Sequence, residues 1–112
     1  MYDRLTPEQR YESLVESMLA APNSVHIGEG PAFDSTGRLK VGGRSFAMLV
    51  NGRLVVKLPS RRVDELVRAG SGERFDGGKG KPMREWFALS PNSHDYWPAL
   101  AMEAMEHVSE RG

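Results

Sequence analysis

The dipeptide Asn51-Gly52 constrains the fold of this chain more than any other feature of its sequence. It lies between two mainly apolar runs, residues 46–50 and 53–58, and both of its residues tolerate the positive φ of a type I′ turn. A two-residue turn also sets the register, because it pairs Val50 with Arg53 and each earlier residue with a later one. The sequence therefore predicts a tight antiparallel hairpin.

The register divides the hairpin into two faces, since paired residues lie on the same side of a sheet. One face is wholly aliphatic and is predicted to pack under helices: Ala47, Leu49, Leu54, Val56 and Leu58. The other is an apolar surface with two cations: Phe46, Met48, Val50, Arg53, Val55 and Lys57. Two interpretations of this second face stay open: it is covered by a helix or a second subunit, or it is an open surface that grips a ligand.

Two long amphipathic helices are predicted near the ends of the chain. Thr6-Pro7-Glu8-Gln9 is a capping box with proline at the first helical position, and an apolar stripe extends from there to about Ala21. The final helix opens within Ser93-His94-Asp95 and ends near Glu110. Its buried side is predicted to hold Trp97, Leu100, Ala101, Ala104, Met105 and Val108.

Shorter elements fill the middle of the chain. Residues 25–27 look extended, and Gly42-Gly43 could turn residues 39–41 back against the hairpin, which would place Lys40 beside Ser45 on the aliphatic face. A short helix follows Pro59-Ser60, which is expected to cap it, and Gly70 ends it. An extended piece at 73–75, a basic loop at 76–82 and a strand at 83–89 complete the pattern, with Phe87 and Leu89 on one face of the strand and Trp86 on the other.

These elements predict one α+β domain over residues 1–112, a two-layer arrangement in which an antiparallel sheet carries the N-terminal and C-terminal helices on one face. The start of the chain has no apolar stretch of the kind found in a secretory signal or a membrane span, so we expect a cytoplasmic protein without membrane contact.

Several chemistries find no support in the sequence. The absence of cysteine excludes disulfides, thiolate metal sites and a thiol nucleophile. Neither a P-loop nor a GxGxxG pattern is present, and His26, His94 and His107 are isolated in the sequence. Ser93-His94-Asp95 is interpreted as helix-cap chemistry, because neighbours in sequence cannot form a hydrolase relay. We therefore expect a non-enzymatic domain with no catalytic residue, no metal and no cofactor.

The formal net charge of zero conceals a strong segregation. Residues 38–84 hold twelve Lys and Arg against four Asp and Glu, so the flanks are acidic. Such a basic block is consistent with contact to nucleic-acid phosphates without sequence readout, or with a homodimer in which acidic helices of one copy meet the basic block of another. The candidate residues for nucleic-acid or anion binding are Arg53, Lys57, Arg61, Arg62, Lys79, Lys81, Arg84 and Trp86.

Several short runs, read in order, resemble a known family. They are 46–54, 57–59, 62–66, 75–76, 80–86 and 103–104, of which Pro82-Met83-Arg84-Glu85-Trp86 is the most specific. Between Arg44 and Val108 the chain is similar to the TfoX N-terminal domain and, more distantly, to MmcQ/YjbR-like domains. The resemblance implies a small α+β domain without a known catalytic residue, related to a bacterial competence regulator and to relatives labelled DNA-binding. Lys40-Val41-Gly42-Gly43 stands where that family shows Met-Phe-Gly-Gly, and we do not expect the second, C-terminal domain of the full regulator.

Overall fold

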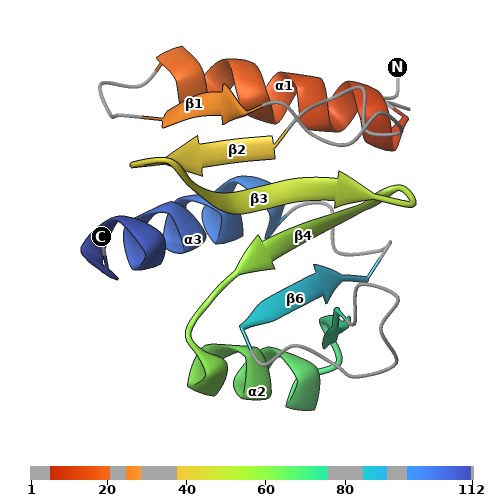
Figure 1. Ribbon diagram of the computed structural model, residues 1–112. Helices are drawn as coiled ribbons and strands as arrows, with labels where there is room; N and C mark the ends of the chain where they lie inside the picture. The colour runs from red at the N-terminus through yellow and green to blue at the C-terminus, as the bar shows by residue number, and fades with distance from the viewer. Residues whose placement is uncertain (1–5, 21–24, 29–37, 76–84, 91–95, 112) are drawn as a thin grey trace.

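The computed structural model describes residues 6–20, 25–28, 38–75, 85–90 and 96–111. The strands within these ranges form one six-stranded antiparallel sheet in the order β1-β2-β3-β4-β6-β5 (Figure 1). The predicted single α+β domain is therefore confirmed. Its elements are α1 (Pro7–Ala20), β1 (Val25–Gly28), β2 (Arg38–Val41), β3 (Arg44–Val50), β4 (Arg53–Lys57), α2 (Ser60–Arg68), β5 (Gly72–Arg74), β6 (Trp86–Leu89) and α3 (Trp97–Arg111).

The hairpin of β3 and β4 has the predicted register. Val50 pairs with Arg53, and the pairing continues to Ala47 and Val56. Asn51 and Gly52 both have positive φ, 52° and 77°, as a type I′ turn requires. Gly42 and Gly43 repeat this arrangement between β2 and β3, with φ of 61° and 79°. Local turn chemistry thus determines two of the sheet's five strand pairings.

A β-bulge between β2 and β3 changes one predicted face. Leu39 pairs with Ala47 and the next residue, Lys40, pairs with Ser45, so Phe46 is an extra residue in β3. Phe46 and Ala47 are both fully buried in the core, and the prediction that Phe46 lies on the face opposite Ala47 is wrong. The bulge also moves Ser45, so the Lys40–Ser45 pairing is confirmed but lies away from the aliphatic face. Strict alternation could not reveal this, because it assumes an unbroken ladder.

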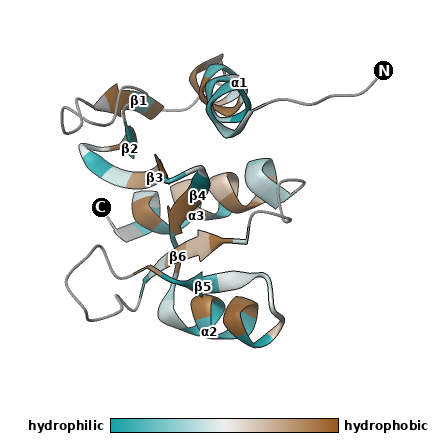
Figure 2. Cartoon of the chain, turned by 90° about the vertical axis from the view of Figure 1, so that its right-hand side faces the viewer, coloured by the Kyte–Doolittle hydropathy of each residue, from teal (hydrophilic) through white to brown (hydrophobic). Residues whose placement is uncertain are grey.

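Helices α1 and α3 cover one face of the sheet (Figure 2). In the capping box of α1, the Thr6 N–H donates to Gln9 Oε1 and the Gln9 N–H donates to Thr6 Oγ1, at 3.0 and 3.1 Å. The predicted inner face of α3 is buried, except that Met105 is only partly covered. The Arg10 guanidinium of α1 lies 6.0 Å from the centre of the buried Trp97 ring of α3. The two helices and the sheet thus form the predicted two layers.

Helix α2 lies beside β5, and its Val63 and Leu66 join the same apolar core. Of the pair Pro59-Ser60 that was expected to cap this helix, Pro59 is the N-cap residue, and it makes no side-chain capping hydrogen bond. The predicted strand at 83–89 is described from Trp86 onward as β6, which lies between β4 and β5. Ser93-His94-Asp95, predicted to open the final helix, lies outside the described residues.

Candidate nucleic-acid interface

The face of the sheet opposite α1 and α3 carries a row of polar and aromatic side chains at one end. His26 pairs with Lys40, Lys40 with Ser45, and Lys57 with Trp86, across the start or end of each strand. The Phe75 N–H donates to the Trp86 carbonyl at 2.9 Å, which continues the β5–β6 register by one residue. We call this set the aromatic–basic row: His26, Lys40, Ser45, Lys57, Trp86 and Phe75.

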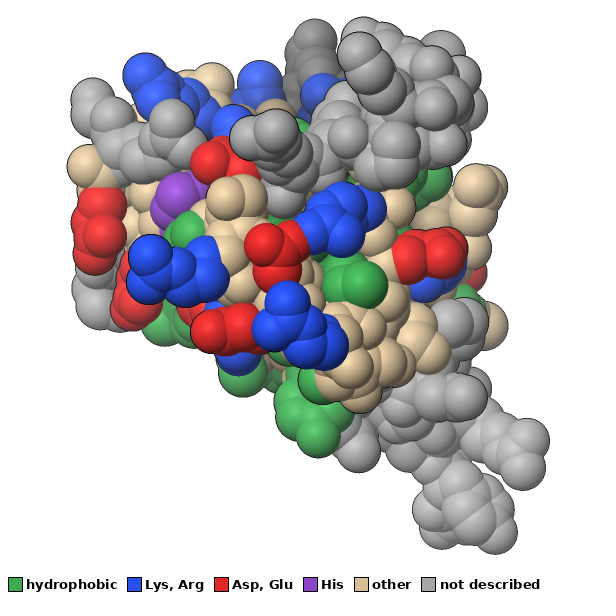
Figure 3. All heavy atoms as spheres, turned by 90° about the horizontal axis from the view of Figure 1, so that it is seen from below, with side chains coloured by type: hydrophobic (Ala, Val, Ile, Leu, Met, Phe, Trp, Pro, Cys, Tyr) green, Lys and Arg blue, Asp and Glu red, His purple; other side chains and the backbone are tan. Residues whose placement is uncertain are grey.

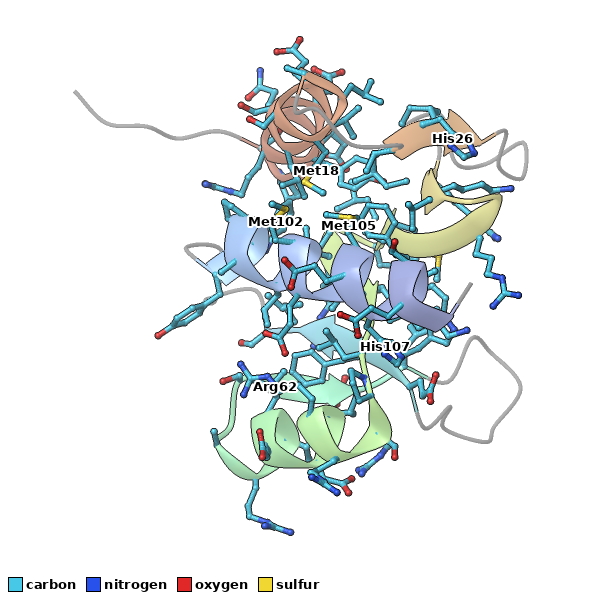
Figure 4. All side chains as sticks on the ribbon, turned by 90° about the vertical axis from the view of Figure 1, so that its left-hand side faces the viewer. Met18, His26, Arg62, Met102, Met105 and His107 are labelled. Atoms are coloured by element: carbon cyan, nitrogen blue, oxygen red, sulfur yellow. The ribbon has the colours of Figure 1, made fainter. Side chains whose placement is uncertain are left out.

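The neighbours of each residue show that the row faces away from the helices. Lys40 lies between the buried Leu39 and Val41, and Lys57 lies between Val56 and Leu58, which are also in the core. Because successive residues of a strand point to opposite faces, both lysines point away from this core. Figure 4 shows His26 on the side of β1 that faces away from α1 and α3.

Lys57 and Trp86 contact each other within the row. The Lys57 Nζ lies 5.9 Å from the centre of the Trp86 ring, within range of a cation–π interaction. Both residues, and Phe75 beside them, are half-buried. A partly exposed aromatic surface with an ammonium group above it can contact a planar ring and a neighbouring anion at the same time.

The electrostatics of this region are one-sided. Residues 38–58, which include β2, β3 and β4, contain five Lys and Arg and no Asp or Glu. The face of the sheet opposite α1 and α3 holds one acidic residue among its described strand residues, Glu73. Its carboxylate forms a salt bridge with Arg53 at 2.9 Å. The row therefore lies in a field of positive charge with little internal neutralisation.

Arg53 differs from the other predicted site residues on the sheet because the protein already uses its guanidinium. Its Nε donates to the Leu89 carbonyl at 2.8 Å, one terminal nitrogen donates to the Ala88 carbonyl at 3.2 Å, and the other binds Glu73. These bonds connect β4 to β6 and β5. The geometry indicates a structural role for Arg53.

Two further residues that were predicted to bind, Arg61 and Arg62, lie on α2 and therefore outside the aromatic–basic row. Arg62 points toward α3 (Figure 4), where its Nε donates to Glu103 at 2.7 Å, and it also binds Glu65 at 3.2 Å. The hydrogen bond to Glu103 raises the pKa of Arg62. Figure 3 shows cationic and acidic side chains intermingled on this end of the molecule. Arg61 is exposed, but Arg62 is largely neutralised.

A shallow hollow of about 510 Å³ lies beside these arginines, lined by Pro59, Ser60, Arg61, Arg62, Glu65 and Glu85. Nearby, His107 Nε2 lies 3.6 Å from Glu85, beyond hydrogen-bond distance. Two cations and two acids in the lining give the hollow no dominant charge. Within the described residues, no three His, Asp or Glu side chains are placed to hold a metal ion.

Lys79, Lys81 and Arg84, the remaining predicted site residues, lie outside the described residues. Conversely, His26, Lys40, Ser45 and Phe75 were not predicted as site residues. The Lys40–Ser45 pairing was predicted, but the bulge at Phe46 hid the face on which it lies, and the insertion of β6 between β4 and β5 hid the neighbours of Phe75.

The face of the sheet opposite α1 and α3 is not open along its whole length. Val55 has no exposed surface and Ala88 is only 4% exposed, so the middle of the helix-free face is closed. On either side of this closed middle the face keeps some exposure, at Met48, Val50 and Arg53 toward the hairpin turn and at the aromatic–basic row toward the other end. None of the helices in the described part of the chain has the length and apolar character needed to cross a membrane.

Comparison with known proteins adds no relative to this geometry: no family model, curated protein or solved structure matches the chain.

Proposed function

We propose that the chain is a non-enzymatic binding domain that contacts nucleic-acid phosphates through the basic side of its sheet, without reading sequence. A single observation carries the proposal. All five charged residues of the segment 38–58 are Lys or Arg, and two of them, Lys40 and Lys57, lie on the face of the sheet opposite α1 and α3. Lysines that neutralise phosphates release counterions, and this term supplies most of non-specific binding. The resemblance to TfoX N-terminal and YjbR-like domains agrees with the proposal.

The test is a comparison of two charge reversals made in the full chain. Lys40→Glu should weaken binding of a labelled oligonucleotide, measured by anisotropy at low salt, for unrelated sequences alike. Arg68→Glu is the matched control, because Arg68 is exposed on α2 and its reversal changes the net charge by the same amount. Each lost phosphate contact should also flatten the plot of log K against log salt by about 0.7 to 0.9.

The result that overturns the proposal is equally direct. Non-specific binders show dissociation constants of about 10⁻⁴ to 10⁻⁶ M, so no binding at a protein concentration of about 100 μM at low salt contradicts it. Equal weakening by Lys40→Glu and Arg68→Glu would also contradict it, because net charge rather than the sheet surface would then govern the affinity.

A second candidate function, a homodimer, is favoured by the opposite charge of the helical layer. Glu8, Glu12 and Glu16 are exposed on α1, and Glu106 and Glu110 are exposed on α3. Acidic helices of one copy could then meet the basic sheet of another. Size-exclusion mass at low salt and at about 0.5 M salt tests this, because screening should dissociate a charge-driven dimer.

A further inference from the structure

We infer that the aromatic–basic row binds single-stranded rather than duplex nucleic acid, with bases stacked on Trp86 and Phe75 and phosphates held by Lys57 and Lys40. This inference rests on the proposed function and specifies its ligand.

The first step of the inference is the chemistry at one end of the row. Phe75 and Trp86 are adjacent across β5 and β6, and Lys57 is adjacent to Trp86 across β4 and β6. Two half-buried aromatic rings with an ammonium group 5.9 Å from one of them match what an unpaired nucleotide offers, a planar base next to a phosphate. Stacking of bases on aromatic side chains is the usual way in which proteins hold single strands, because every base has a π-face.

The second step is the length and direction of the row. It crosses the strands rather than following one of them, and neighbouring strands are about 4.8 Å apart. Six strands therefore give a track of about 24 Å, enough for a few nucleotides and comparable with the smallest single-strand sites of about 4 nucleotides. Lys40 and His26 continue the track beyond Lys57, toward the β1 edge. A nucleic-acid strand whose first bases stack on Phe75 and Trp86 would thus meet the ammonium group of Lys40 and the imidazole of His26 farther along its backbone.

The third step excludes the duplex as the better ligand. In a duplex the bases are stacked on one another, so their faces cannot reach Trp86 or Phe75 unless the helix opens. Only the phosphates would then contact the row, and the aromatic contribution would be lost. Binding of duplex phosphates requires lysines but no aromatic rings, whereas this row places Trp86 and Phe75 beside Lys57.

The experiment uses the fluorescence of the chain's two tryptophans. Trp97 is only 5% exposed and lies under Arg10, so it should not respond to a ligand on the opposite face of the sheet. Titration of the wild-type chain with a thymidine oligomer of about 12 nucleotides should quench part of the emission in a saturable manner. A duplex of the same length should quench little and bind more weakly.

Two variants assign the signal. Trp86→Ala should weaken binding of the oligomer by about tenfold, the size of one lost base–aromatic contact, and leave duplex affinity nearly unchanged. Trp86→Phe retains a stacking surface, so it should bind the oligomer nearly as well as wild type while the quenching disappears. Circular dichroism checks that each variant is folded, and Trp86→Phe keeps the inference testable if Trp86→Ala is not.

The outcomes separate this inference from the proposed function. Equal affinity for oligomer and duplex without quenching overturns single-strand binding and leaves phosphate binding standing. Quenching that persists in Trp86→Phe also overturns it, because the signal would then come from Trp97. No binding of either nucleic acid overturns the proposed function itself.

Discussion

Gly72 is a position where even one added methyl group should destabilise the fold. It pairs with Leu89 in β6, and a Cβ added there would lie 2.2 Å from the Ala88 carbonyl oxygen and 2.7 Å from Phe87 Cζ. Ordinary carbon–oxygen contacts are no shorter than about 3.3 Å, so Gly72→Ala must push β5 away from β6 by about 1 Å. The backbone, unlike a flexible side chain, cannot simply rotate out of the way.

The expected loss of stability combines two contributions. Overpacking at a tight site costs about 1–3 kcal/mol, and the displaced carbonyl is also the acceptor of an Arg53 hydrogen bond at 3.2 Å, the loss of which adds roughly 1 kcal/mol. The free energy of unfolding should therefore fall by about 2–4 kcal/mol. With an unfolding entropy of about 2.1 cal/mol/K per residue, a chain of 112 residues should melt about 8–17 °C lower.

Thermal unfolding followed by circular dichroism measures this shift, and Gly70→Ala is the control. Gly70 has a φ of 80° but nothing within 4 Å of an added Cβ, so alanine there brings backbone strain of about 1–2 kcal/mol without a collision. Gly72→Ala should be clearly the worse of the two. A Gly72→Ala protein that melts within about 2 °C of wild type would refute the close approach of β5 to β6.

Three further variants probe other parts of the fold. Gly52→Val forces a β-branched residue to a φ of 77° and should cost more than about 1 kcal/mol in urea unfolding, and an unchanged midpoint would contradict the turn. Thr6→Ala removes the side-chain acceptor of the Gln9 N–H and should cost about 1 kcal/mol by the same measurement, whereas Thr6→Ser should retain most of the stability. Arg53→Met leaves the Ala88 and Leu89 carbonyls without their guanidinium donor, so we expect a loss of about 1.5–3 kcal/mol with oligonucleotide affinity reduced far less than by Lys40→Glu. An Arg53→Met protein of wild-type stability that no longer binds oligonucleotide would reverse the roles assigned to these two cations.

Local signals in the sequence predicted most of the fold. Asn51-Gly52 determines a turn and a register by itself, and Thr6 with Gln9 determines the start of a helix, because each depends only on residues within one turn of the chain. The apolar stripe of α3 likewise predicted which of its residues are buried. The face of Phe46 could not be predicted, because a bulge depends on how two strands fit together rather than on either strand alone.

The candidate site was predicted less well, for a related physical reason. Lys57 and Trp86 were recognised from their residue types, but their contact joins residues 29 positions apart, on two strands that are neighbours in the sheet and not consecutive in the sequence. Arg53 was predicted to bind a ligand because the sequence does not show that its guanidinium already has partners. These partners are backbone carbonyls 35 and 36 residues away, which no residue type or spacing reveals. Charge counts locate a basic region, whereas only the pairing of strands shows which cations are still available.

The place of β6 between β4 and β5 also bears on how the chain folds during synthesis. Both neighbours of β6 precede it in the sequence, so β4 and β5 leave the ribosome while the strand that joins them is still missing. The local meander of β1 to β4 can form first, since its turns close short loops. Until Trp86–Leu89 arrives, β4 is an edge strand that carries Leu54, Val55 and Val56, side chains that are fully buried in the finished fold. Because this four-residue strand is synthesised late, the apolar edge of β4 is exposed to neighbouring chains in the meantime. The basic residues at both ends of β4, Arg53 and Lys57, are the charges that help prevent this edge from pairing with another chain.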